Sequence, residues 1–213
     1  MTRILLVRHG ESTANQEGVF AGGYDIPLTE LGHIQAVCTA EFVTKHYSVD
    51  VIYSSDLCRA YQTAEHCAQR LGLSICVEKG LREIQGGAWE ARPFASLGDT
   101  HPEEYGMMMR DFGNSYCPGG ESVAELALRV SQTLSRIAKE NPGKTILVTT
   151  HGTPIRAMQW AATGKDLSAM QAIPWVSNAS VTELSWENES FHCVKIGQDT
   201  HLAELKTFLP PTI

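Results

Sequence analysis

Four consecutive apolar residues near the start of the chain, Ile4-Leu5-Leu6-Val7, are followed at once by Arg8-His9-Gly10. A short apolar run with branched side chains is typical of a strand that is buried on both faces, as in a parallel sheet. Ligands of open α/β sheets bind outside the carboxyl ends of the strands, so Arg8 and His9 are expected to face a crevice. Gly10 allows the chain to turn sharply at this point.

A second apolar run, residues 145–149, ends in Thr150-His151-Gly152 in the same way. Thr153 is expected to cap the next helix and Pro154 to begin it, because proline is tolerated at the first helical position. Arg156 in that helix is interpreted as a structural ion-pair residue close to the site. Strands far apart in sequence can end at one edge of a parallel sheet, so the two histidines are expected to be neighbours.

Helix and strand patterns alternate through the first part of the chain. Thr29 is the expected cap of a helix that runs to about Lys45. Its apolar residues at helical spacing are expected to face the core: Leu31, Ile34, Cys38 and Phe42. After a strand at residues 51–53, Asp56 is the expected cap of a second helix, which places Arg59 in the first turn. Backbone N–H groups and the helix dipole favour an anion there.

The other expected elements follow the same alternation. A strand is expected at residues 74–77, and Ser122 with Glu125 forms a capping-box pattern at the start of a helix that ends before Pro142. Residues 181–186 and 191–196 are expected to form a hairpin at the edge of the sheet. The Pro210-Pro211 tail is expected to be frayed.

Between Gln85 and Gly120 the periodicity disappears, while aromatic, Met and Gly residues accumulate. We interpret this stretch, here named the cap segment, as a short excursion over the mouth of the site and not as a separate domain. Its three consecutive methionines, residues 107–109, are either core packing or an adaptable substrate wall. The chain, residues 1–213, is expected to be one α/β domain with a mostly parallel sheet between two helical layers.

Composition limits the classes of partner. The 213-residue chain has a formal net charge of −7 and no basic run, so nucleic acid is not an expected partner. No apolar run approaches the roughly 18 residues that suggest a membrane span, and a signal peptide is not expected from the residues before the first strand. The six cysteines lack CxxC spacing and are interpreted as reduced thiols of a cytoplasmic protein. The sequence is also compatible with a homodimer.

The opening of the chain resembles the histidine phosphatase superfamily, which has the phosphoglycerate-mutase-like fold. The resemblance is carried by Arg8-His9-Gly10-Glu11-Ser12, Asn15, Ala21-Gly22 and residues 27–32, and it continues through residues 53–57, 81–84, 118–122 and 178–179. It implies that Arg8, His9, Arg59 and His151 form a phosphate pocket and that Glu83 supplies a proton. It further implies that the substrate site is lined by Asn15, Ala21, Gly22 and Gly152. No cofactor and no bound metal are expected.

These residue types suit the cleavage of a phosphomonoester, which carries close to two negative charges near neutral pH. Two arginines can hold the phosphoryl oxygens in a fixed orientation. A neutral His9 can attack phosphorus and form phosphohistidine, and His151, if protonated, can stabilise charge on the transferring oxygens. Glu83 can protonate the departing oxygen and then accept a proton from the attacking water.

Three alternatives to a phosphatase of small phosphorylated metabolites stay open. A phosphoglycerate mutase would share every residue named above, but the cap segment is shorter than in that branch and has only Arg92 and Arg110 as cations. A metal site built from His9, His151 and Glu83 is disfavoured by the neighbouring arginines, which repel a divalent cation. A non-catalytic module that binds phosphorylated ligands predicts loss of the nucleophile or the acid. We therefore expect hydrolysis, with the natural phosphoester unassigned.

Overall fold

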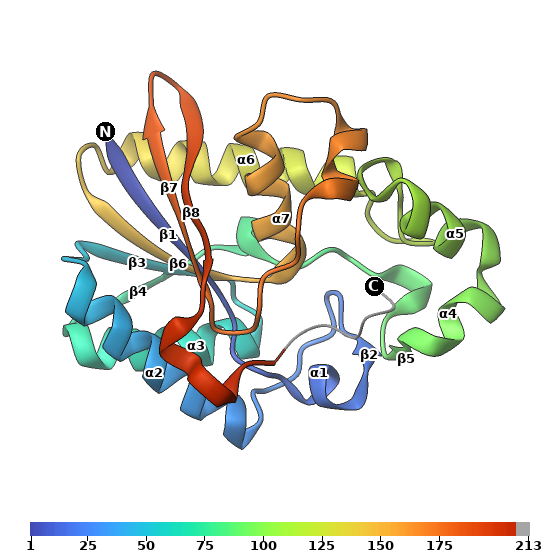
Figure 1. Ribbon diagram of the computed structural model, residues 1–213, viewed down its shortest axis with the longest axis horizontal. Helices are drawn as coiled ribbons and strands as arrows, with labels where there is room; N and C mark the ends of the chain where they lie inside the picture. The colour runs from blue at the N-terminus through green and yellow to red at the C-terminus, as the bar shows by residue number, and fades with distance from the viewer. Residues whose placement is uncertain (208–213) are drawn as a thin grey trace.

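A six-stranded sheet forms the centre of the computed structural model, which describes residues 1–207 (Figure 1). Its strand order is β4-β3-β6-β1-β7-β8. The strands are β1 (Thr2–Arg8), β3 (Val51–Ser54), β4 (Ile75–Val77), β6 (Thr145–Thr150), β7 (Val181–Glu187) and β8 (Ser190–Gln198). The first four in that order are parallel, and the β7–β8 hairpin is antiparallel. The mostly parallel α/β sheet and the edge hairpin are confirmed. The Pro210-Pro211 tail lies outside the described residues.

The two apolar runs that end in a histidine are neighbouring strands at the centre of this sheet. β1 and β6 are parallel and in register from Arg3 opposite Thr145 to Arg8 opposite Thr150. All four residues of the first run are completely buried, as are Ile146, Leu147 and Val148. Both strands therefore deliver the residues that follow them to the same edge of the sheet.

Helices cover both faces of the sheet (Figure 1). They are α2 (Glu30–His46) and α3 (Cys58–Leu71) on one face, and α6 (Val123–Glu140) and α7 (Gly152–Ala161) on the other. Alternate residues of β1 divide between the faces, with Ile4 and Leu6 in the core under α6 and α7, and Leu5 and Val7 in the core under α2 and α3. The predicted three-layer α/β/α arrangement is confirmed.

Two helices begin where the sequence did not place their caps. α7 has His151 as its N-cap, two residues before the predicted Thr153, so the N–H of Thr153 lies in the first turn and has no acceptor within the helix. α3 has Leu57 as its N-cap, and Asp56 instead accepts two hydrogen bonds from Arg82. The cap at α6 agrees with the sequence, because Ser122 and Glu125 form the predicted capping box.

The buried face of α2 is also different from the predicted one. Ile34 is 51% exposed, and Leu31, Cys38 and Phe42 are only partly buried. The face that meets the sheet instead carries Gly32, Gln35, Ala36, Thr39, Ala40 and Val43. The contact is close, since a Cβ on Gly10 would lie 2.3 Å from the carbonyl oxygen of Gly32. At this contact only glycine fits, whereas the buried face further along α2 carries residues as large as Gln35 and Val43.

The cap segment contains more regular structure than its sequence predicts. It includes β5 (Arg92–Pro93), α4 (Phe94–Thr100) and α5 (Pro102–Arg110), and β5 pairs with β2 (Val19–Phe20). Figure 1 shows α4 and α5 together at one side of the molecule, next to this pair. Helices of this length show little periodicity and depend on tertiary contacts. Leu97 and Met108 supply such contacts, since both are buried.

The two ends of the cap segment meet. The N–H of Glu121 donates to the carbonyl of Gln85 at 2.9 Å, and the N–H of Ala88 donates to the carbonyl of Pro118 at 2.8 Å. The segment thus leaves the body of the fold and returns to it at one place.

Short elements complete the described part of the chain. α1 (Thr13–Glu17) follows the turn after β1, with Ser12 as its cap. Short 3₁₀ helices lie at Lys79–Leu81, Gly87–Trp89, Phe112–Asn114, Leu167–Ala172 and Thr200–Leu205.

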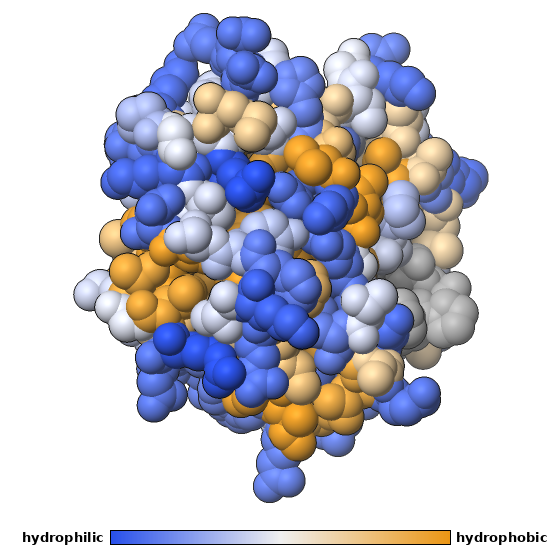
Figure 2. Space-filling model, turned by 60° about the vertical axis from the view of Figure 1, so that its left-hand side comes forward, coloured by the Kyte–Doolittle hydropathy of each residue, from blue (hydrophilic) through white to orange (hydrophobic). Residues whose placement is uncertain are grey.

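Hydrophobic residues form separate patches on the face of the molecule that Figure 2 draws. On the face drawn in Figure 2 these patches are divided by hydrophilic side chains, so this face has no broad continuous apolar area. Among residues 1–207, no helix combines the length and the apolar character that a bilayer span requires.

Candidate active site

His9 lies at the carboxyl end of β1 and is almost completely buried, with 4% of its surface exposed. Its Nδ1 is 2.7 Å from the carbonyl oxygen of Gly10. A carbonyl can only accept a hydrogen bond, so Nδ1 carries the proton and Nε2 keeps its lone pair. Burial lowers the pKa of His9 well below its usual value, and Arg59 and Arg8 lower it further. His9 is therefore neutral, with Nε2 free to act as a nucleophile.

His151 lies beside His9 at the carboxyl end of β6, as the two strand patterns predict. The two ring centroids are 5.2 Å apart. The Nε2 of His151 is 2.9 Å from the hydroxyl oxygen of Ser55. Burial, followed by the charge of Arg59, lowers the pKa of His151 well below its usual value. The cationic form considered from sequence is thus disfavoured here, and only an anion close to the ring would favour it.

Arg8 and Arg59 are buried cations with no carboxylate within ion-pair distance among residues 1–207. Arg8 donates to the carbonyl of Val176 at 2.6 Å, and Arg59 donates to the carbonyl of Gly22 at 2.8 Å. The Nε of each guanidinium is buried and makes no hydrogen bond within the described chain. Burial lowers the pKa of each arginine to about 10, so both stay charged at neutral pH. Two such cations side by side form a site for an anion.

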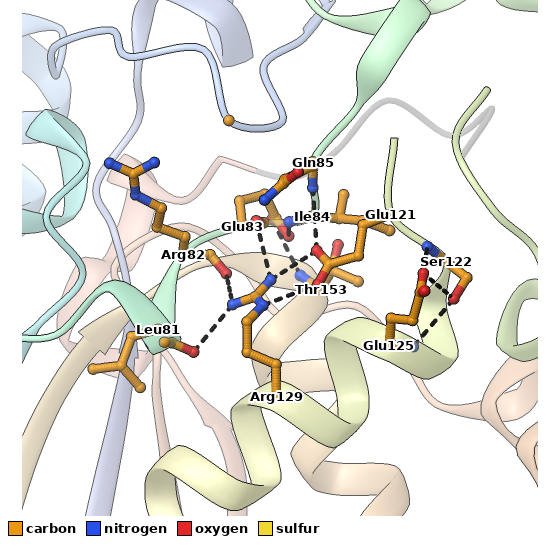
Figure 3. A network of polar contacts seen from close by, with 12 residues as sticks. Leu81, Arg82, Glu83, Ile84, Gln85, Glu121, Ser122, Glu125, Arg129 and Thr153 are labelled. Atoms are coloured by element: carbon orange, nitrogen blue, oxygen red, sulfur yellow. Dashed lines mark hydrogen bonds and ion pairs between the residues drawn. The ribbon is translucent and has the colours of Figure 1, made fainter. Parts of the chain in front are cut away.

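Glu83 reaches the same site from the segment before the cap (Figure 3). One carboxylate oxygen accepts the N–H of Ile84 at 2.8 Å, and the other accepts the N–H of Thr153 at 3.2 Å. Thr153 lies in the first turn of α7, directly after His151 and Gly152. The amino end of one helix therefore joins the second histidine to the carboxylate.

A single cavity connects most of the residues that the sequence indicated. Its lining includes Arg8, His9, Asn15, Ala21, Gly22, Arg59, Glu83 and Gly152. His151 lies behind this lining, in contact with the ring of His9. The geometry thus brings the whole predicted set together.

The outer wall of the cavity is mostly apolar. Its apolar side chains are Val19, Phe20, Ile84, Trp89, Phe94, Met108, Phe112, Val123 and Trp175, and Ser115, Tyr116 and Cys117 also line it. Met108 is the one methionine of the three that lines this wall, so the substrate-wall interpretation applies to it alone. Arg92 and Arg110, the two cations of the cap segment, are exposed and do not line the cavity.

Sequence reasoning assigned no role to several residues that shape the site. Asn178 donates to the carbonyl of His9 at 3.1 Å and to Oδ1 of Asn15 at 3.1 Å, and so links two pocket segments. Trp175 lines the cavity although no motif surrounds it. Asn178 belongs to a stretch that carries the family resemblance, but the sequence did not indicate its contacts, and no recognisable pattern surrounds Trp175.

Arg156 does not form the predicted ion pair. Its guanidinium lies 4.2 Å from the ring centroid of Phe112 and 4.4 Å from that of Trp175, and Nη2 donates to the carbonyl of Met170 at 3.1 Å. This cation–π sandwich holds two aromatic residues of the cavity wall in place.

Comparisons with known proteins agree with this site. The family model described as "Histidine phosphatase superfamily (branch 1)" matches residues 4–199. The chain is 32% identical over 204 residues to phosphoserine phosphatase 1 of Hydrogenobacter thermophilus, covering 96% of each chain. It is 33% identical to a metal-independent phosphoserine phosphatase of Arabidopsis thaliana, over 92% of this chain and 85% of that protein.

Solved structures of related proteins have a similar fold. A mycobacterial glucosyl-3-phosphoglycerate phosphatase in complex with VO3 superposes with a TM-score of 0.86 and 29% identity, covering 92% of this chain and 99% of that chain. Bacillus stearothermophilus YhfR superposes with a TM-score of 0.89 and 26% identity, covering 95% of this chain and 100% of that chain.

Proposed function

Because this chain belongs to the histidine phosphatase superfamily, we propose that His9 attacks a phosphomonoester and carries its phosphoryl group until water releases phosphate. The chain is an enzyme of the phosphatase type, as its named relatives are. The observation that carries the proposal is the neutral His9, with the lone pair of Nε2 free beside two buried arginines.

The reaction then follows from the positions of five side chains. Arg8, Arg59 and His151 bind the phosphoryl oxygens, and the charge of the dianion raises the pKa of His151. Nε2 of His9 forms a bond to phosphorus as the ester P–O bond breaks. Glu83, in its protonated form, gives its proton to the departing oxygen. Water next attacks phosphorus, Glu83 takes the proton from water, and the P–N bond breaks to release phosphate.

We also propose that the leaving group is uncharged and largely apolar. Among residues 1–207, the only cationic side chains that line the cavity are Arg8 and Arg59, apart from the titratable His9, and all three serve the phosphoryl group. A second anionic group on the substrate would meet aromatic and Met side chains and a few neutral polar groups such as Ser115 and Tyr116, but no further cation, so its burial would be costly. We therefore expect this chain to disfavour phosphoserine, the substrate for which two of its relatives are named.

The same wall favours hydrolysis over mutase activity. Retransfer to a bound sugar acid requires a site that holds the acid and shields phosphohistidine from water. The two cap arginines that could bind such an acid, Arg92 and Arg110, do not line the cavity. A small phosphorylated metabolite as substrate, the cytoplasm as location and a possible homodimer are parts of this proposal.

Rapid quenching tests the role of His9. Wild-type protein mixed with an aryl phosphate labelled in the phosphoryl group should yield an acid-labile, base-stable phosphoprotein, and His9→Ala should yield none. His192→Ala, an exposed histidine on β8, is the matched control and should trap label like wild type. Trapping by His9→Ala would overturn the assignment.

A substrate panel tests the leaving group. Phosphate release from phenyl phosphate and benzyl phosphate should exceed release from phosphoserine at equal concentration. Faster hydrolysis of phosphoserine would show that the wall accepts a charged group, and the proposal for the leaving group would be wrong while that for His9 stands.

A further inference from the structure

Arg129 lies on α6, outside the cavity, and its side chain points at the segment that carries Glu83 (Figure 3). Its Nη1 donates to the carbonyls of Gly80 and Arg82, both at 3.0 Å, and Nη2 lies 3.4 Å from the carbonyl of Glu83. The carbonyl of the remaining residue, Leu81, accepts from the hydroxyl of Thr150 at 2.7 Å. Every backbone carbonyl from residue 80 to residue 83 thus has a partner, and three of the four share one guanidinium.

The same guanidinium is held from its other side by Glu121, which directly follows the cap segment. Nε and Nη2 of Arg129 donate to the two carboxylate oxygens of Glu121, at 2.9 and 2.8 Å. This paired geometry fixes the plane of an arginine in a way that lysine cannot reproduce. Glu121 also accepts the N–H of Gln85 at 3.3 Å, and its own N–H donates to the carbonyl of Gln85 at 2.9 Å. The Arg129–Glu121 pair therefore holds the backbone on both sides of Glu83.

The position of this backbone decides where the Glu83 carboxylate lies. The carboxylate is directed by the N–H groups of Ile84 and Thr153, and the first of these belongs to the held segment. The segment is also pressed against α6, because a Cβ on Gly80 would lie 2.1 Å from Oγ1 of Thr133. A shift of the carbonyls away from Arg129 would move Glu83 relative to α7 and to His9, which are fixed by the sheet.

We propose that Arg129 is a positioning residue for proton transfer by Glu83. It holds residues 80–85 so that the carboxyl proton passes to the departing oxygen as the P–O bond breaks, and so that the carboxylate later takes a proton from water. The inference rests on the proposed function, because the role of Glu83 belongs to that proposal. Arg129 itself does not line the cavity and contacts no reacting atom.

The dependence of rate on the leaving group separates this role from a purely structural one. The oxygen of p-nitrophenyl phosphate departs with little need for a proton, whereas the oxygen of benzyl phosphate needs one. Damage to the phosphate pocket or to folding slows both substrates alike. Displacement of the acid slows phosphorylation by benzyl phosphate more than phosphorylation by the aryl ester.

The experiment measures single-turnover phosphorylation of His9 by both esters in wild type and in Arg129→Ala, Arg129→Lys, Glu83→Gln and Arg136→Ala. Arg136 is the matched control, since it lies on the same helix and pairs with Glu78 and Glu140 but touches no carbonyl of residues 80–83. General acid catalysis accelerates a reaction by about 10² to 10⁴. If the acid is displaced, Arg129→Ala should therefore reduce the rate of phosphorylation by benzyl phosphate on the order of 10-fold more than the rate by p-nitrophenyl phosphate. Arg136→Ala should show no such difference.

Each outcome bears on one claim. Equal slowing of both esters in Arg129→Ala, beside selective slowing in Glu83→Gln, would overturn the inference and leave Glu83 as the acid. Absence of selectivity in Glu83→Gln would remove that residue from the reaction and the inference with it. If Arg129→Ala does not fold, Arg129→Lys decides, because lysine keeps the charge and loses the paired geometry. Selective slowing of phosphorylation by benzyl phosphate in Arg129→Lys would support the inference. Wild-type rates for both esters would overturn it.

Discussion

The two buried histidines predict how the stability of the protein depends on pH. Burial lowers the pKa of His9 and of His151 well below the usual value, so both stay neutral in the folded protein as the pH falls. In the unfolded chain a histidine is protonated below about pH 6.5. The unfolded state then binds more protons than the folded state, and the free energy of unfolding decreases as the pH falls. The stability that the two neutral histidines contribute is present above pH 6.5 and is lost as the pH falls below it.

The size of the effect follows from proton linkage. Between pH 6 and pH 5, a histidine that is neutral when folded and has a pKa of about 6.5 when unfolded loses about 1.2 kcal/mol of stability. His9 and His151 together should therefore lower the free energy of unfolding by about 2.4 kcal/mol over this interval. This is a large share of the roughly 5–15 kcal/mol that stabilises a typical domain.

Urea unfolding at pH 6 and at pH 5 measures the change. His9→Gln and His151→Gln should each reduce the loss between the two pH values by about 1.2 kcal/mol relative to wild type. His192→Gln is the control, because this exposed residue should leave the difference unchanged. Comparison with wild type removes the contribution of carboxylates, which titrate in all four proteins. An unaltered pH dependence in both buried-histidine variants would show that these rings bind protons in the folded state.

Three further predictions concern the metal, the turn after β1 and the reaction. Excess chelator should leave phosphate release unchanged, and activity that returned only after addition of Zn²⁺ or Mg²⁺ would contradict the mechanism. Gly10→Ala should cost about 1–3 kcal/mol in urea unfolding, because its Cβ would lie 2.3 Å from the Gly32 carbonyl oxygen. A Cβ on Gly72 would meet no atom within 4 Å. Gly72→Ala should therefore lower the free energy of unfolding by only roughly 1–2 kcal/mol, because the backbone there is left-handed, and a larger loss would refute the contact argument. Phosphate release from aryl phosphates should exceed isomerisation of 3-phosphoglycerate with or without its 2,3-bisphosphate, and the reverse order would identify a mutase.

The parts of the site that could be predicted are encoded in contiguous residues. Arg8-His9-Gly10 and Thr150-His151-Gly152 each place a polar turn directly after an apolar strand, and parallel pairing of β1 and β6 brings the turns together. Glu83 has no such local signal, and only the resemblance to a family pointed to it. Its two N–H partners come from neighbouring Ile84 and distant Thr153, so its environment depends on tertiary structure.

The parts that could not be predicted depend on distances between elements. Ile34 is an apolar residue at helical spacing, yet it is exposed, because the close contact of Gly32 with the turn after β1 orients α2 so that the face with Gln35 and Ala36 is buried instead. Arg129 lies on a helix whose pattern predicts only an amphipathic surface, and its acceptors are backbone carbonyls, which have no residue signature. Asp56 was expected to cap a helix, but Arg82 offers it two charge-assisted hydrogen bonds.

The meeting of the cap ends at Gln85 and Glu121 has a consequence for how such enzymes can diverge. The bond between their backbones closes the segment on itself, so its interior can change in length or sequence without displacing the strands that carry the histidines. Phe94, Met108 and Phe112, which line the cavity, all lie inside this closed segment. A lineage can therefore acquire new substrates by replacing one continuous stretch of the gene, while the machinery that breaks the phosphoester bond is inherited intact.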